Sequence, residues 1–279
     1  MNNTKLLVLI VIGLLVVSVT VSAIMLIPRS DKGDENKNDK APDVPPGLQK
    51  IVFIHYKKGF ASPFCNDNGV CEQGEKKNCA DCRNGGGEEE STCYAFLGKG
   101  VKWRDLPQNY VIDPDNEDGL SQSFIVSAIT AGTEEWDAHT STNLFGSYSI
   151  DHSATWDGWI NSVPDGENEM VFDDYPQAGV IAVTVTWGYF TGKPSTRRII
   201  EFDILYDTDF VWGDGEADSS VMDLQNIAVH EVGHGIGLGD LYNTGCIDET
   251  MYGYSGEGDI EKRDLNTGDI AGLHILYGP

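Results

Sequence analysis

The chain has 279 residues, of which 40% are hydrophobic, and it carries a net charge of −25. A chain of this length can bury one sizeable core and still carry a smaller module. The acidic balance excludes nucleic acid as an expected partner, because affinity for nucleic acid comes from Lys and Arg side chains that neutralise phosphates.

The N-terminal segment, residues 1–28, contains an uncharged run of 22 residues from Leu6 to Ile27. As a helix this run would span roughly 33 Å, enough to cross the hydrocarbon core of a membrane. The apolar core of a signal peptide is usually shorter, about 7–15 residues. We therefore interpret the segment as a membrane anchor, with a signal peptide cleaved after Ala23 as the alternative. Both interpretations place the rest of the chain on the extracellular side, either anchored or secreted.

Two segments separate this N-terminus from the main domain. Residues 29–64 are predicted to form a polar tether with one short apolar run, Ile51 to Tyr56, which is a candidate strand without an evident partner. Residues 65–91 are predicted to form a small cysteine-rich module followed by a Gly/Glu linker. Export favours disulfides over a small zinc site for its four cysteines, which are Cys65, Cys71, Cys79 and Cys82. The sequence leaves open whether residues 29–91 are an inhibitory pro-segment or a stalk.

Residues 92–279 contain no further linker and are interpreted as one domain of α+β or mixed α/β class. Strand-like runs and helical periodicities alternate along it. The strands are expected at 109–114, 148–151, 169–174, 179–190 and 197–206. Helices are expected at 121–139, from a capping box at Ser220 and Asp223 through His230, and at about 267–277.

The segment "HEVGHGIGLGD" contains the residues with the clearest chemical signature. In a helix, His230 and His234 lie one turn apart on the same face and can direct two imidazoles at one cation. Glu231 is rotated by about 100° from His230, so it can hold a water molecule without ligating the metal. This H-E-x-x-H pattern is typical of a zinc site in which the glutamate acts as general base.

Three glycines and an aspartate follow the second histidine. Gly235, Gly237 and Gly239 are poor helix formers, so we expect the helix to end and the backbone to turn through a positive φ. The turn at Gly237 would bring Asp240 back to the metal. Because a catalytic zinc usually has three protein ligands and accepts carboxylate oxygen, Asp240 is the candidate third ligand.

The pattern His-Glu-x-x-His-x-x-Gly-x-x-Asp, followed by "ETMYGYS", resembles the metzincin metallopeptidases, and most of all their prokaryotic matrixin-like group. Further stretches resemble that catalytic domain over residues 92–279. The resemblance implies a twisted, mostly parallel five-stranded sheet with an active-site helix and a C-terminal helix. It also implies that Met251 forms the methionine turn beneath the metal and that Tyr254 lines the S1′ pocket. The cysteine switch and the second zinc cluster of vertebrate matrixins are missing, and His152 is interpreted as a surface residue.

The activity implied by the resemblance is zinc-dependent cleavage of protein or peptide substrates, with Glu231 as general base. An extended peptide would add to the strand at 179–190, which is expected to form the sheet edge beside the cleft. A bound Ca²⁺ is the alternative to solvated charge for the acidic stretches at 66–75 and 165–169.

Cys93 and Cys246 are the two cysteines outside the small module, and we expect them to form a disulfide; the alternative is that Cys93 is a zinc-binding switch. Two rival functions stay open. One is a peptidase with a downstream glutamate as third ligand, for which the candidates are Glu249, Glu257 and Glu261. The other is a cell-surface binding module with a non-catalytic metal site.

Overall fold

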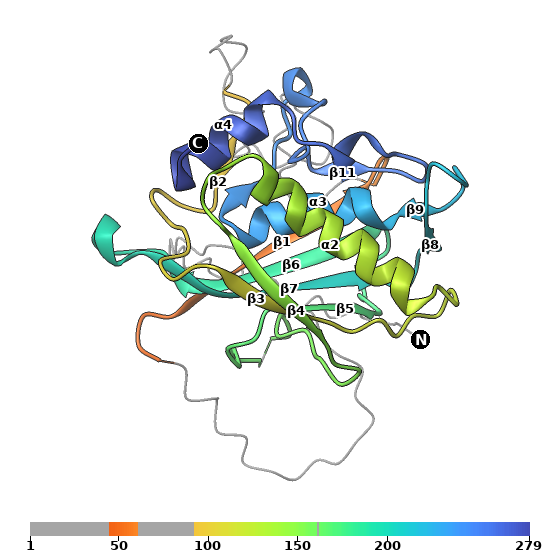
Figure 1. The fold of residues 1–279 in the computed structure, drawn as a ribbon, viewed down its shortest axis with the longest axis horizontal. Helices are drawn as coiled ribbons and strands as arrows, with labels where there is room; N and C mark the ends of the chain where they lie inside the picture. Colours follow the sequence, from red (N-terminus) through yellow and green to blue (C-terminus); the bar gives the residue numbers. More distant parts are fainter. Residues whose placement is uncertain (1–44, 61–91, 161) are drawn as a thin grey trace, which may run out of the picture. The chain divides into compact units, whose positions relative to one another are not determined.

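The structure is a computed structural model, and it describes residues 45–60, 92–160 and 162–279 (Figure 1). The predicted anchor at 1–28, most of the tether and the four cysteines between 65 and 82 lie outside these residues. Among the helices that the structure describes, none is both long and apolar enough to cross a membrane.

A seven-stranded sheet forms the centre of the fold (Figure 1), with strand order β11-β1-β6-β7-β5-β3-β4. Its strands are β1 (Gln49–Lys57), β3 (Gln108–Ile112), β4 (Phe145–Ile150), β5 (Glu169–Asp173), β6 (Val180–Tyr189), β7 (Arg198–Asp207) and β11 (Tyr254–Ser255). Four of the six neighbouring pairs are parallel, and β6 runs antiparallel to both β7 and β1. The predicted mixed α/β class with a mostly parallel sheet is confirmed. The five expected strands correspond to β3–β7, and β1 and β11 extend the sheet.

Strand β1 contains the apolar run for which the sequence showed no partner. It pairs antiparallel with β6 from Gln49, opposite Gly188, to Tyr56, opposite Val180. The expectation that β6 forms an open edge beside the cleft is therefore wrong for the described residues, since β1 covers it. A run rich in β-branched and aromatic residues can pair with any open strand, so the local pattern could not identify a partner more than 120 residues away.

Helices α2 (Gln122–Ala138) and α3 (Leu224–Gly235) pack against each other beside the sheet (Figure 1). They approach closely at Gly132, where an added Cβ would lie 3.1 Å from the backbone of Ala228. Helix α3 begins after Asp223, whose carboxylate accepts from the Asn226 N–H, and not at the predicted cap, Ser220. Asp223 is also held by an ion pair with Arg263, which fixes the helix start at this point.

The remaining elements are short and connect the sheet to the helices. They are β2 (Ala95–Phe96) paired with β10 (Leu238–Gly239), β8 (Trp212–Gly213) paired with β9 (Met222–Asp223), the 3₁₀ turns η1 (Pro194–Thr196), η2 (Thr244–Cys246) and η3 (Glu261–Arg263), and helix α4 (Thr267–Tyr277). A disulfide joins Cys93 to Cys246, the pair favoured by the sequence. It ties the start of the domain to the loop that follows β10.

Candidate metal centre

Helix α3 carries the two histidines in a fully buried environment. His230, Glu231 and His234 are each at most 1% exposed. Two indole groups fix the helix by donating to its carbonyls, Trp136 to Val229 O at 2.8 Å and Trp103 to Gly235 O at 2.8 Å. The i, i+4 spacing of the histidines is thus held rigidly by the surrounding core.

The chain reverses direction at Gly237, which has φ +107°. This conformation is strained for other residues, and an added Cβ would also lie 3.1 Å from Val101 O. Gly235 has a different role from the one expected: it lacks a positive φ, and an added Cβ would lie 2.7 Å from the Phe202 ring. One glycine therefore makes the turn, and the other allows the helix end to pack against β7.

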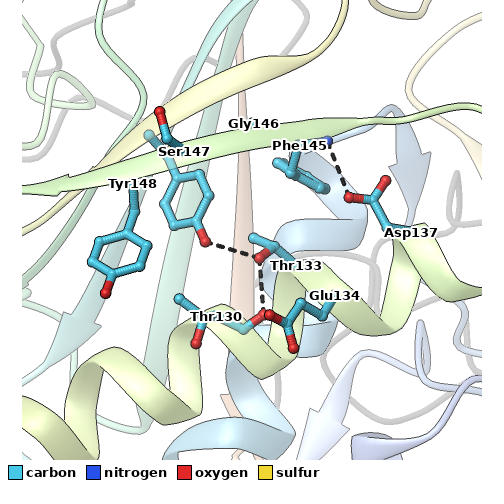
Figure 2. Close-up of a pocket in the computed structure, with 9 residues that line it drawn as sticks. Thr130, Thr133, Glu134, Asp137, Phe145, Gly146, Ser147 and Tyr148 are labelled. Atoms are coloured by element: carbon cyan, nitrogen blue, oxygen red, sulfur yellow. Dashed lines mark hydrogen bonds between the residues drawn. The ribbon is translucent and has the colours of Figure 1, made fainter.

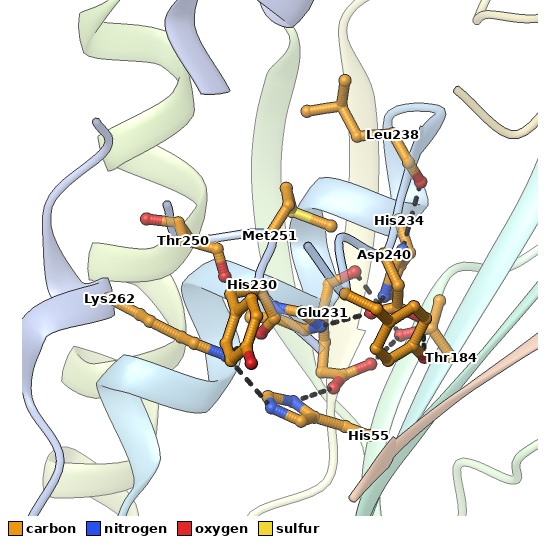
Figure 3. Close-up of polar contacts among 12 residues, drawn as sticks. His55, Thr184, His230, Glu231, His234, Leu238, Asp240, Thr250, Met251 and Lys262 are labelled. Atoms are coloured by element: carbon orange, nitrogen blue, oxygen red, sulfur yellow. Dashed lines mark hydrogen bonds and ion pairs between the residues drawn. The ribbon is translucent and has the colours of Figure 1, made fainter. Parts of the chain in front are cut away.

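The turn brings Asp240 to the two histidines (Figure 3). Asp240 Oδ1 lies 3.2 Å from His230 Nε2 and 3.3 Å from His234 Nε2. Donor atoms around a tetrahedral zinc with bonds of about 2.0–2.1 Å stand about 3.3 Å apart. Both distances therefore fit donor atoms that share one zinc ion.

Hydrogen bonds at the opposite ring nitrogens support the same conclusion. His230 Nδ1 lies 2.6 Å from Thr250 O, and His234 Nδ1 lies 3.1 Å from Leu238 O. A carbonyl can only accept, so each Nδ1 carries a proton, and in the neutral ring Nε2 then holds the lone pair that a metal requires. His230 Nε2 and Asp240 Oδ1 are buried and make no well-formed hydrogen bond. Buried polar atoms without partners are rare, and a cation would satisfy both.

Glu231 points into the space beside these ligands (Figure 3). Its Oε2 accepts from Thr184 Oγ1 at 2.6 Å, and its Oε1 lies 3.0 Å from His55 Nδ1. Burial raises the pKa of Glu231 to about 7. A carboxylate with a pKa close to neutrality can both accept and return a proton, which suits a general acid–base role.

The segment around Met251 lies directly beneath the histidine helix. An added Cβ at Gly233 would lie 2.3 Å from Met251 Sδ, so only glycine permits this approach. The carboxylate of Asp269 at the start of α4 accepts from the Thr250 N–H at 2.7 Å and the Met251 N–H at 3.1 Å. Thr250 O also accepts a hydrogen bond from His230 Nδ1. The turn at Thr250 and Met251 therefore holds the imidazole of this ligand candidate in place.

Comparison with known proteins agrees with this geometry. The family model described as Matrixin matches residues 102–278, more than half of the chain. The chain belongs to the matrixin family. Matrixins are the zinc metalloendopeptidase class that the sequence resembles.

Two curated relatives illustrate how far the similarity extends. The chain is 34% identical over 106 residues to matrix metalloproteinase-25 of Homo sapiens and 38% identical over 107 residues to metalloendoproteinase 4-MMP of Arabidopsis thaliana. Each alignment covers 38% of this chain, but only 18% and 28% of those proteins, respectively. This matrixin therefore matches less than a third of the length of either relative.

Tyr254, the predicted pocket residue, lies on β11 of the matrixin fold, opposite Tyr56 of β1. Its ring packs edge-on against Tyr242, with centroids 5.5 Å apart. Tyr242 in turn donates from its hydroxyl to Asp240 Oδ2 at 3.1 Å. Tyr242 thus connects β11, the strand that carries Tyr254, to Asp240, the candidate third ligand.

Sequence reasoning missed three residues of this site: His55, Thr184 and Lys262. Lys262 is buried, its Nζ lies 3.2 Å from His55 Nε2, and it also contacts Tyr252 O. Burial lowers the pKa of Lys262 to about 7. Thr184 could have been found from strand alternation on β6, but nothing local marks His55 or Lys262 as neighbours of the metal ligands.

The glutamates considered as rival ligands lie elsewhere in the matrixin. Glu249 Oε2 accepts from the Gly268 N–H at 2.9 Å and the Asp269 N–H at 3.2 Å, so it caps α4. Glu257 pairs with Lys57, and the Glu261 carboxylate accepts from the Ile260 N–H. These contacts favour Asp240 over the rival candidates.

A second group of carboxylates gathers where the 155–169 loop meets β7. Oxygens of Asp157, Glu169 and Glu201 are buried there without hydrogen-bond partners. Burial raises the pKa of Glu201 to about 8 and that of Glu169 to about 7. Asp165 lies within the same group. Exposed His152 contacts Asp115 at 2.8 Å, away from these carboxylates.

A polar hollow between α2 and β4 is separate from both groups (Figure 2). Its polar side chains serve the fold: Tyr110 OH bonds Thr133 Oγ1 at 3.0 Å, and Asp137 accepts from the Leu144 and Phe145 N–H groups. None of the metal-ligand candidates lines it.

Proposed function

We propose that this matrixin is an exported zinc-dependent endopeptidase in which His230, His234 and Asp240 hold the metal. The proposal is carried by Asp240 Oδ1, which lies at tetrahedral spacing from both histidine Nε2 atoms, beside the buried carboxylate of Glu231. Asp240 as third ligand supports membership of the prokaryotic matrixin-like group.

Zinc in this site would supply a Lewis acid that polarises the scissile carbonyl and acidifies a water molecule. Glu231 then accepts the proton of the attacking water and returns it to the leaving amine. The Thr184 hydroxyl holds one oxygen of Glu231 and directs the other toward the cleft. A protein or peptide substrate would lie beside these groups, with Met251 supporting the metal ligands and Tyr254 lining a side-chain pocket.

We also propose export with membrane attachment through the run from Leu6 to Ile27. The disulfide between Cys93 and Cys246 supports export, because structural disulfides persist in oxidising compartments.

A structural Ca²⁺ at the second carboxylate group is proposed as well. Several carboxylates with unpaired buried oxygens repel each other unless a cation or protons neutralise them. Calcium prefers oxygen ligands, and Asp157, Asp165 and Glu201 each offer one within a small volume.

The test is cleavage of an unfolded protein by the segment 92–279, compared with its Glu231→Gln twin and a chelator-treated sample. We expect zinc-dependent cleavage that the twin lacks, with equal zinc content and equal thermal stability in both proteins. If the folded, zinc-loaded wild-type segment cleaves neither this substrate nor a peptide library, the peptidase proposal is wrong and a non-catalytic surface module takes its place.

A further inference from the structure

We propose that a basic patch at the hairpin between β6 and β7 docks this domain onto the anionic phospholipid headgroups of the membrane that holds the N-terminal segment. The inference rests on the proposed membrane attachment. It goes beyond that attachment because it names a second contact and the side of the domain that faces the bilayer. The basic patch consists of Lys99, Lys102, Arg104, Lys193, Arg197 and Arg198.

The basic patch contrasts with the charge of the whole chain. Only 19 residues of the chain are Lys or Arg, whereas 44 are Asp or Glu. Residues 97–104 and 189–200 nevertheless contain six Lys and Arg residues and no Asp or Glu. A cluster of about four to eight such side chains is attracted to anionic lipids when it lies at a bilayer surface.

Hydrogen bonds hold the two segments of the basic patch side by side. The Arg197 guanidinium donates to Lys99 O at 2.6 Å. The Arg104 guanidinium donates to Arg197 O at 3.0 Å and to Pro194 O at 2.9 Å. Because a main-chain carbonyl carries no net charge, these bonds fix the positions of both guanidinium groups without neutralising them.

The positive charges of the basic patch have no carboxylate partner within the described residues, where none of its six side chains forms an ion pair. Lys99, Lys193 and Arg198 are exposed. Burial, and after it the positive charge of Arg104, lowers the pKa of Lys102, so like charges repel each other here. An external anion would offset this repulsion.

The path of the chain indicates which anionic surface lies within reach. The first described residues, 45–48, lead into Gln49, whose Oε1 accepts from the Phe190 N–H at 3.3 Å and from Thr191 Oγ1 at 3.2 Å. The chain therefore enters the domain beside the hairpin that carries the basic patch (Figure 1). Because 17 residues separate Ile27 from Pro45, their reach is at most about 60 Å. An anchored chain thus keeps the patch at a high effective concentration near the bilayer.

The acidic remainder of the chain restricts the direction of approach. A net charge of −25 is repelled by an anionic bilayer, so only the side that carries the basic patch can make close contact. At physiological salt the Debye length is about 8 Å, and the repulsion of distant carboxylates is screened. An acidic polypeptide would also match the charge of the patch, but the short connection to the anchor favours the bilayer.

The test uses the full chain with Glu231→Gln, which prevents self-cleavage, in nanodiscs of phosphatidylcholine with or without phosphatidylglycerol. Acylation by a water-soluble reagent, followed by mass spectrometry, measures how accessible Lys99 and Lys193 are. Lys58 is the internal control because it follows the other end of β1, roughly 30 Å from Gln49 at about 3.3 Å per residue.

We expect acylation of Lys99 and Lys193 to be at least about fivefold slower in the anionic discs, which corresponds to about four of five molecules being docked. Acylation of Lys58 should proceed at the same rate in both kinds of disc. In about 1 M salt, where the Debye length is about 3 Å, the difference at Lys99 and Lys193 should disappear.

A pair of charge reversals separates the effect of the basic patch from that of net charge. Lys99→Glu combined with Arg198→Glu changes two exposed members of the patch. Acylation is then followed at Lys193, which should lose its protection in anionic discs. The matched control is Lys57→Glu combined with Lys58→Glu, which changes the net charge equally at the other end of β1. In this control, the protection of Lys193 should remain.

Equal acylation of Lys193 in the two kinds of disc overturns the proposal, and so does equal protection in the patch variant and its control. If polyglutamate slows the acylation and the anionic disc does not, the patch binds an acidic polypeptide and membrane docking is wrong.

Failure of the proposed membrane attachment is distinguishable from failure of docking, because an unanchored chain does not remain in neutral discs. Such a chain is mixed with vesicles instead. Cosedimentation with phosphatidylglycerol vesicles and not with phosphatidylcholine vesicles upholds the basic patch as a lipid-binding surface, and equal cosedimentation with both overturns it. Neither measurement requires cleavage, so both are independent of the peptidase function.

Discussion

Replacing Asp240 with alanine removes the carboxylate that lies 3.2 and 3.3 Å from the two histidine nitrogens. Four-ligand structural zinc sites bind with about 10–16 kcal/mol, or roughly 2.5–4 kcal/mol for each ligand. At about 1.4 kcal/mol per factor of ten, the variant should bind zinc roughly 100- to 1000-fold more weakly. Glu249 cannot substitute, because its carboxylate is held by the first N–H groups of α4.

Competition with a fluorescent zinc chelator measures the affinity, and circular dichroism checks that the variant remains folded. The matched control is Glu249→Gln, which should lower the melting temperature but leave zinc affinity within about threefold. Retention of zinc by Asp240→Ala within about threefold of wild type, or loss of zinc from Glu249→Gln, would refute the assignment of the third ligand.

Three further predictions concern stability. Gly233→Ala would place a Cβ 2.3 Å from Met251 Sδ; overpacking of this kind costs about 1–3 kcal/mol, so calorimetry should show a melting point several degrees lower, and an unchanged value would contradict the packing. Burial raises the pKa of Glu201 to about 8, above its unfolded value; its stabilising contribution is therefore complete below about pH 4.5 and lost as pH rises through 8. In the presence of a chelator, the melting temperature should fall as the pH rises from 6 to 8.5, and it should fall less steeply in Glu201→Gln. Ca²⁺ added in place of the chelator should remove this dependence of the melting temperature on pH. A pH dependence that the substitution leaves unchanged would exclude the Glu201 carboxyl as its source. Replacing Cys93 and Cys246 together with serine should cost about 2–4 kcal/mol in denaturant unfolding, and no change would mean that the disulfide is not formed.

The sequence by itself determined the parts of this protein whose signals are local. The i, i+4 spacing of His230 and His234 requires only helical geometry, and the helix is where the periodicity predicted it. Gly237 marked the turn toward Asp240 because few other residues adopt its positive φ. The five strands β3–β7 and helix α4 were likewise found within a few residues, since each contains its own hydrophobic pattern and turn residues.

Only the tertiary structure decided what lies against these elements. Strand β1 and its partner β6 are separated by more than 120 residues, and an apolar strand carries no mark of which edge it will cover. His55 reaches Glu231, and Lys262 reaches His55, only because the sheet register and the η3 turn bring these side chains together. Local periodicity defines which face of an element is buried, whereas the pairing of distant faces depends on the packing of the whole core. That packing brings His55, Thr184 and Lys262 to the candidate metal centre.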